Sequence, residues 1–153
     1  MRKPFSLQAV LDYKTSILEV RELELAELLR QQIAATQKMA SLQELESREQ
    51  VEMKRIQQAK YLDVVDMRWR QERQESLREQ IAAQQEHLSR VQDKVEAKRE
   101  EVLVAHQEQE VLVKLQEKEA LAEREEDQRR ELSEADEIST TRHFRRQIAN
   151  SIG

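Results

Sequence analysis

Residues that form turns, disulfide bonds and thiolate metal sites are nearly absent from this chain of 153 residues. It has no cysteine, one proline at position 4, one glycine at position 153, and 3% aromatic residues. Without cysteine the chain can form neither a disulfide bond nor a cysteine-ligated metal site. So few turn-forming and aromatic residues exclude a globular domain with many short elements and leave the long-helix class.

Long hydrophobic runs are also missing. No stretch approaches the roughly 18 consecutive apolar residues that span a bilayer, and the start of the chain has no uninterrupted apolar segment of the kind that directs secretion. Charged residues make up 37% of the chain and the net charge is −5, so a general nucleic-acid-binding surface is not expected. We therefore expect a soluble, cytoplasmic protein.

The sequence does contain a repeat of apolar residues at alternating three- and four-residue steps, which is typical of helices wound around a partner helix. We call its positions the seam. One set of seam positions comprises Leu11, Leu18, Leu25, Gln32, Met39, Glu46 and Met53, and later Ile81, Leu88, Val95, Val102 and Gln109. The other comprises Lys14, Arg21, Leu28, Ala35, Leu42, Glu49 and Ile56, and later Leu77, Gln84, Val91, Lys98, Ala105 and Leu112.

The seam lapses between Ile56 and Leu77, where four of the five repeat positions are polar. This lapse predicts two arms that fold back on each other, so the expected fold class is all-α, an antiparallel two-helix coiled-coil hairpin. We predict a single domain with a first arm over about 6–60, a tip over about 61–68, a second arm over about 69–138 and a basic tail over 139–153. The seven-residue register is the same on both sides of the lapse, and no Gly or Pro marks a turn. A parallel coiled-coil dimer acting as a scaffold or tether therefore stays open.

The first arm is predicted to begin near Leu7, with Ser6 as its cap and with Phe5 and Val10 as a hydrophobic staple. Apolar residues beside the seam, at Val10, Ile17, Val20 and Ile33, predict either a wide seam or a face for an additional partner. Glu46 and Glu49 occupy consecutive seam positions. Either basic residues of the partner helix shield them, or the coil opens there.

Two stretches stand out as candidate contact surfaces. Tyr61, Leu62 and the only tryptophan, Trp69, lie off the seam near the tip. They either pack across the bend as a hydrophobic plug or form an exposed patch for a partner, because Trp and Tyr are favoured interface residues.

The tail has the opposite charge to the segment before it. Between Glu117 and Glu137 there are ten acidic and four basic residues, whereas from Ser139 onward Arg142, Arg145 and Arg146 stand without any acid. Its larger apolar residues, Phe144, Ile148 and Ile152, recur every four residues. The tail is either an amphipathic helix that docks on an acidic partner or a membrane surface, or a frayed terminus.

Catalytic chemistry is not expected. His87, His106 and His143 lie far apart, at spacings that place no two of them on one helix face as metal ligands. No glycine-rich loop could hold a phosphate, and a two-helix coil offers no concavity that excludes water. We predict no catalytic residue, no metal site and no cofactor, and hence a protein that works through its surfaces.

Several short patches, taken in order, carry a resemblance to a known family. They are Phe5-x-Leu7-x-x-Val10-Leu11 with Glu19 downstream, Tyr61-Leu62, Leu77-Arg78-Glu79-Gln80-Ile81, Leu115-x-x-Lys118, and Glu131 followed by Asp136-Glu137-Ile138 and Arg142, Arg145 and Arg146. In order and spacing the sequence resembles the flagellar export protein FliJ family over nearly its whole length. This resemblance implies a hairpin similar to the stalk subunit of rotary ATPases.

The resemblance also implies partners and contact residues. Members insert the end that carries both termini into the hexameric export ATPase, promote assembly of that ring, contact the cytoplasmic part of the membrane export gate, and handle export chaperones. The implied ATPase-ring contacts are Phe5, Leu7, Leu11, Arg142, Arg145 and Arg146. The implied export-gate contacts at the tip are Tyr61, Leu62 and Trp69. The expected location is the cytoplasm, partly at the inner membrane, which the chain reaches only through partners. An injectisome stalk protein of the same architecture is the nearest alternative.

Overall fold

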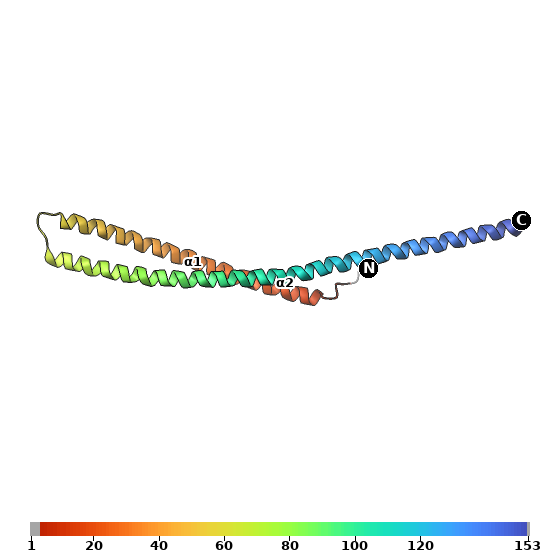
Figure 1. Cartoon of the computed structure of the whole chain (residues 1–153), viewed down its shortest axis with the longest axis horizontal. Coiled ribbons are helices and arrows are strands. Elements are labelled where there is room, and N and C mark those ends of the chain that lie inside the picture. Colours follow the sequence, from red (N-terminus) through yellow and green to blue (C-terminus); the bar gives the residue numbers. More distant parts are fainter. Residues whose placement is uncertain (1–3, 153) are drawn as a thin grey trace. The chain divides into compact units, whose positions relative to one another are not determined.

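Two long helices make up the computed structural model, which describes residues 4–152 (Figure 1). Helix α1 spans Gln8–Gln57 and helix α2 spans Val64–Ile152, and no strand occurs in the described residues. Contacts divide the chain into two units, which we describe separately. We call residues 17–105 the hairpin arm, and residues 4–16 together with 106–152 the terminal unit.

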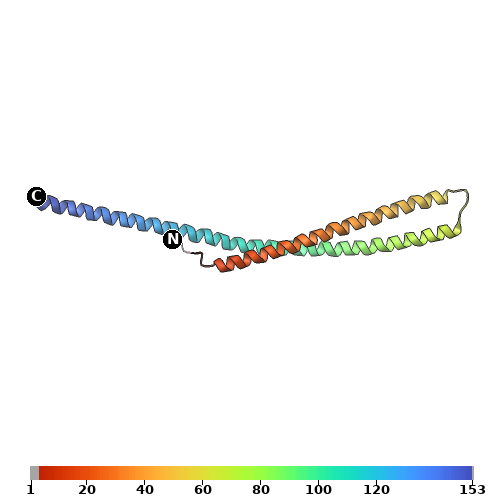
Figure 2. The same cartoon turned by 180° about the vertical axis from the view of Figure 1, so that it is seen from behind.

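The hairpin arm pairs α1 with α2 in antiparallel directions, as Figures 1 and 2 show from opposite sides. Its buried residues all fall on seam positions and comprise Leu18, Ala35, Met39, Leu42, Met53, Leu77, Gln84, Val91, Val95 and Ala105. Val95 is the most deeply buried, with 1% of its surface exposed. The predicted all-α antiparallel hairpin is therefore confirmed, and the seam is filled from within one chain rather than by a parallel partner.

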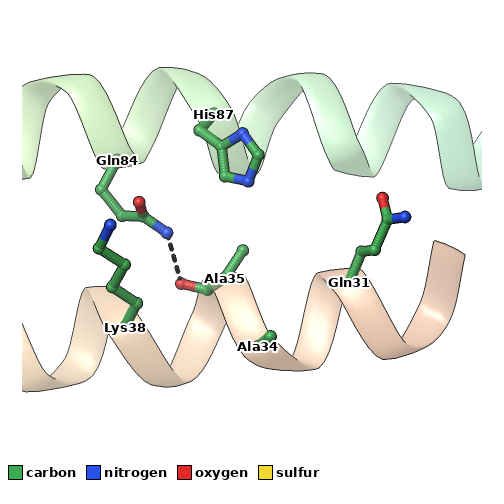
Figure 3. Close-up of a pocket in the computed structure, with 6 residues that line it drawn as sticks. All are labelled: Gln31, Ala34, Ala35, Lys38, Gln84 and His87. Carbon is green, nitrogen blue, oxygen red and sulfur yellow. Dashed lines mark hydrogen bonds between the residues drawn. The ribbon is translucent and has the colours of Figure 1, made fainter.

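One buried seam residue is polar. Gln84 is 6% exposed, and its Nε2 donates a hydrogen bond to the backbone oxygen of Ala35 at 3.0 Å (Figure 3). The small Ala35 side chain leaves space for the longer glutamine on the facing helix. Because a buried amide without a partner is costly, this bond favours one alignment of α1 against α2.

The tip is a six-residue connection, 58–63, that needs neither Gly nor Pro. No residue of the described chain has a positive φ, so the turn is built from ordinary backbone conformations. Asp63 caps α2, because its Oδ1 accepts hydrogen bonds from the backbone N–H groups of Val65 at 3.0 Å and Asp66 at 3.3 Å. Residues 64–68, predicted as part of the tip, are the first turns of α2.

A charge cluster occupies the seam next to the tip. The side chain of Glu49 is 13% exposed; its Oε1 lies 3.4 Å from Arg73 Nε and its Oε2 lies 3.7 Å from Arg70 Nη1. Arg70 also reaches Glu52 Oε1 at 3.9 Å and Asp66 Oδ2 at 3.3 Å. Of the two alternatives for Glu49, shielding by basic residues of the partner helix is the one observed. The polar seam positions here are thus filled by ion pairs.

The terminal unit is paired mostly through polar groups. Its only buried residue among those described is Leu11, at 7% exposure. Four hydrogen bonds join α1 and the residues before it to α2, and we call them the polar ladder. They are Ser6 Oγ to Glu119 Oε2 at 3.1 Å, Gln116 Nε2 to Gln8 Oε1 at 3.2 Å, Lys14 Nζ to Glu108 Oε2 at 2.9 Å, and Gln109 Nε2 to Thr15 Oγ1 at 3.0 Å.

The predicted cap at Ser6 is not observed: among the described residues no backbone N–H of the first turn of α1 donates to its hydroxyl, which itself donates to Glu119. At the other end of the terminal unit, α2 continues beyond the start of α1 (Figure 1). Residues 124–152 are all exposed, and we call them the unpaired segment. The tail from Ser139 belongs to this segment and is helical as far as Ile152.

Candidate interaction surfaces

Large apolar side chains gather at the tip and point to solvent. Tyr61 and Leu62 lie in the connection and are 85% and 54% exposed, and Trp69, early in α2, is 53% exposed. Of the two alternatives, a hydrophobic plug across the bend is not observed, and these three side chains are exposed. Its place between the helices is taken by the ion pairs of Arg70 and Glu49, and residues off the seam point away from the partner helix.

Two further exposed apolar residues lie in the same stretch of the chain, and they were not among the predicted contact residues. Val64 and Val65 are 76% and 78% exposed. We define the tip patch as Tyr61, Leu62, Val64, Val65 and Trp69. The signal that could have identified the valines is a pair of adjacent apolar residues, off the seam, directly after a capping aspartate. The guanidinium of Arg73 lies 5.6 Å from the centre of the Trp69 ring, a cation–π contact that restrains this side chain.

The candidate ring contacts near the N-terminus have different environments. Leu7 is 40% exposed and Phe5 is half-buried, so both present surface to a partner. Leu11 is 7% exposed and lies on the seam. A protein partner could reach Leu11 only by separating the helices, so its structural role is packing.

The three candidate arginines of the tail lie apart from Phe5 and Leu7. The bond between Ser6 and Glu119 fixes which level of α2 faces the start of α1. Arg142 comes 23 residues after Glu119, and at 1.5 Å of rise per residue this is about 35 Å farther along the helix. The six predicted ring contacts therefore form two separate surfaces within the terminal unit.

The tail itself presents both charge and apolar area. Phe144, Ile148 and Ile152 are 62%, 43% and 82% exposed. We define the tail face as these three residues together with Arg142, Arg145 and Arg146. Within residues 4–152, the three arginines form no ion pair.

A hollow on the flank of the hairpin arm is lined by Gln31, Ala34, Ala35, Lys38, Gln84 and His87 (Figure 3). It forms because two alanines face longer side chains, and the Gln84 amide is already bonded to Ala35. Residues 4–152 hold no group of three or more His, Asp or Glu side chains placed to bind a metal ion. Over the same range, neither helix has a segment apolar and long enough to cross a bilayer.

Two lysines at seam positions, Lys14 and Lys98, form ion pairs with glutamates that lie beside the seam. Lys98 Nζ lies 2.7 Å from Glu101 Oε2 and 2.5 Å from Glu24 Oε2. These hydrogen bonds raise the pKa of Lys98, and the bond from Lys98 lowers the pKa of Glu24. In the terminal unit the hydrogen bond to Glu108 raises the pKa of Lys14 in the same way. All these charges stay in contact with water.

Comparison with known proteins adds one match. The family model described as the flagellar FliJ protein matches residues 2–148 of the chain. The matched range covers α1, the tip patch and all three tail arginines. No curated protein and no solved structure matches. The resemblance found in the sequence is thereby confirmed over nearly the whole chain, and it favours a flagellar system over an injectisome.

Proposed function

The chain belongs to the flagellar FliJ protein family and is a component of the flagellar export apparatus, and on this basis we propose that it acts as a non-enzymatic stalk within the export ATPase ring. It promotes assembly and activity of the hexameric ring and links the ring to the membrane export gate and to export chaperones. It works in the cytoplasm, partly at the inner membrane. The observation that carries the proposal is the family match, which extends over both helices of the hairpin.

The surface of the paired helices suits this role physically. Its ion pairs are exposed, for example Lys14 with Glu108 at 2.9 Å and Arg48 with Glu44 at 2.6 Å. Exposed pairs of this kind contribute about 0–1 kcal/mol each and exchange partners easily. A stalk with such a surface can contact successive ring subunits without binding one of them too tightly to leave it.

Two surfaces of the terminal unit are the proposed ring contacts. Phe5 and Leu7 form the first, with Leu11 supporting them from the seam. Arg142, Arg145 and Arg146 form the second, about 35 Å farther along α2 by its rise per residue. A ring contact that uses both surfaces at once must therefore extend along α2 instead of being confined to one level.

The tip patch is the proposed contact to the export gate. Trp and Tyr side chains often contribute most of the binding energy at protein interfaces, and Tyr61 is 85% exposed here. The restraint that Arg73 places on Trp69 lowers the entropy lost when a partner binds.

The ring contact is tested by measuring ATP hydrolysis by the export ATPase as the chain is added. Changing Arg142, Arg145 and Arg146 together to Glu is expected to raise the concentration needed for half-maximal stimulation by about ten- to a hundredfold, since three exposed pairs are lost. The matched control changes Arg124, Arg129 and Arg130 to Glu, which alters charge equally on the same helix. Unchanged stimulation by a folded tail variant would remove the tail from the mechanism.

The gate contact is tested separately by binding to the cytoplasmic part of the gate protein. Changing Tyr61 and Trp69 to Ala should abolish most of this binding, while stimulation of the ATPase stays at the level of the unmodified chain. Loss of both activities together would instead mean that the tip variant disturbs the hairpin, which circular dichroism would reveal.

A further inference from the structure

The last turns of α2 combine positive charge with an absence of neutralising partners. Residues 138–153 contain three arginines and no acid. The preceding helix shows the alternative, because there Arg130 Nη2 lies 2.8 Å from Glu126 Oε1. Arg142, Arg145 and Arg146 form no such pair within the described part of the chain. Their guanidinium groups are therefore available to anions outside the molecule.

The same turns carry an apolar strip. Side chains four residues apart in a helix are rotated by about 40°, so Phe144, Ile148 and Ile152 lie within an arc of about 80°. Continuing in the same sense, Arg145 lies about 20° past Ile152 and Arg142 about 80° past it, whereas Arg146 lies about 160° from the centre of the strip, on the opposite side of the helix. The opposite border of the strip holds uncharged Ser151 and Thr140. The helix thus has an apolar face bordered on one side by arginines and on the other by small polar residues.

From these observations we propose that the tail face binds directly to bilayers that contain anionic lipids. The helix lies in the plane of the surface, with Phe144, Ile148 and Ile152 among the upper parts of the acyl chains. Arg142 and Arg145 then lie nearest the lipid phosphates, where guanidinium groups donate hydrogen bonds to phosphate oxygens, whereas Arg146, on the opposite side of the helix, is attracted to the anionic surface by its charge alone.

A bilayer fits this face better than an acidic protein helix does. The apolar residues advance in equal steps of four, whereas a partner helix in a coiled coil requires alternating steps of three and four. An acidic helix would also need carboxylates in register with the three arginines. A bilayer presents negative charge above an apolar interior at every position, so a short face without a seam can bind it.

Binding of the tail face to lipid goes beyond the proposed function and does not depend on it, whereas competition with the ATPase ring rests on the proposed ring contact. Direct binding to lipid replaces the expectation that the chain reaches the membrane only through partner proteins. Because the same arginines are the proposed ring contacts, lipid and ATPase ring compete for the tail. The chain would then exchange a membrane-bound state for a ring-bound state without any change in the hairpin.

The experiment is co-sedimentation of the full chain with vesicles, in the absence of the ATPase. One set of vesicles is phosphatidylcholine alone, and the other contains phosphatidylglycerol as well. We expect binding to the anionic vesicles only, weakened by salt. Changing Arg142, Arg145 and Arg146 to Gln should weaken binding by about a hundredfold, since each arginine near an anionic surface contributes about fivefold.

Two further variants separate lipid binding from general attraction of charge. The variant Arg124→Gln/Arg129→Gln/Arg130→Gln removes three positive charges from the same exposed helix and should bind within about twofold of the unmodified chain. Changing Phe144 and Ile148 to Ser keeps every charge and should still lose most of the binding, because the apolar strip is gone. Leu132→Ser, at a residue that is 67% exposed, is its control.

Insertion itself is read from fluorescence. In a chain with Trp69→Phe and Phe144→Trp, the single tryptophan should shift to shorter wavelength when anionic vesicles are added. The proposal is overturned if the unmodified chain does not sediment with anionic vesicles, if both arginine triples lose binding equally, or if the tryptophan does not shift. Binding to poly-glutamate without binding to vesicles would assign the tail to an acidic protein partner instead.

Discussion

The hairpin arm and the terminal unit use the same two helices but hold them together in different ways. In the arm, nine apolar seam residues are buried, from Leu18 to Ala105, together with Gln84. In the described part of the terminal unit, Leu11 is the one buried seam residue, Leu112 is half-buried, and the polar ladder adds four hydrogen bonds between the helices. Apolar burial contributes about 25 cal/mol per Å², whereas an exposed hydrogen bond that water can replace contributes little net stability.

This difference suggests that the two units have different mechanical roles. The arm keeps the tip patch presented at the end of a stable pair of helices. The terminal unit, with weak pairing and an unpaired segment, can change its contacts at low energetic cost. The proposed function, in which the tip patch contacts the gate and the terminal unit contacts the ring, would use both properties.

The arm should be most sensitive to loss of apolar volume. Leu77→Ala, at a seam residue that is 7% exposed, is expected to lower the free energy of unfolding by about 2–3 kcal/mol, because it removes buried area and leaves a cavity. The measurement is urea denaturation followed by circular dichroism. Leu121→Ala, at a residue of the terminal unit that is 56% exposed, should change this free energy by less than about 0.5 kcal/mol. Equal costs at the two positions would contradict the contrast between the units.

The charge cluster of the arm should give the next largest effect. Arg70→Met keeps the packing of the side-chain stem but leaves Glu49, at 13% exposure, with weaker compensation. The expected cost is about 1–2 kcal/mol in the free energy of unfolding. Arg48→Met, which breaks the exposed pair with Glu44, should cost no more than about 0.5 kcal/mol.

A double variant sharpens the interpretation of this cluster. Glu49→Leu combined with Arg70→Leu places two apolar residues at seam positions, and it should be as stable as the unmodified chain or more stable. If the double variant is as unstable as Arg70→Met, the ion pair contributes more than its desolvation costs. The interpretation that these ion pairs occupy the seam without adding net stability would then be wrong.

The parts of the fold that follow from the repeat were predictable from the sequence. Every residue that is buried within the described range 4–152, from Leu11 to Ala105, occupies a predicted seam position, because the three- and four-residue steps report directly which face meets a partner helix. The turn was harder to predict. Its marker is neither Gly nor Pro but the capping side chain of Asp63, and a single aspartate in an acidic sequence is a weak signal.

The candidate surfaces were predicted less completely. Tyr61 and Trp69 were identified by residue type, but their exposure depends on whether Arg70 or an apolar residue fills the seam beside them. The distance between Leu7 and Arg142 depends on the level of α2 that faces the start of α1, which no local pattern encodes. Polar seam residues such as Gln109 can pair in several alignments, so the polar ladder could not be assigned from sequence.

Replacing polar residues of the polar ladder by leucine would make the terminal unit pair through apolar contacts, as the hairpin arm does. Gln109→Leu combined with Gln116→Leu continues the seam of α2 into the terminal unit. We expect amide hydrogen exchange over residues 8–16 to slow by about fivefold, because opening this end would then expose apolar surface. Gln107→Leu, an exposed position off the seam, is the control. Unchanged exchange in the double variant would mean that seam polarity does not govern how this end opens.

The smallest expected effect is the pH dependence of the flanking charge pairs, and its sign follows from the pKa shifts. The hydrogen bond from Lys98 lowers the pKa of Glu24, so this pair stabilises the fold above the usual glutamate pKa of about 4.3 and loses its effect as the pH falls through the lowered value. The pKa of Lys98 is raised, so at alkaline pH the contribution is present below about 10.4 and is lost as the pH rises through the raised value.

Glu24→Gln should make the melting temperature slightly less sensitive to acid in thermal scans followed by circular dichroism. In a Lys98→Met background the same substitution should have a smaller effect, because only Arg21 then lowers the pKa of Glu24; an undiminished effect would show that the bond from Lys98 is not the main cause.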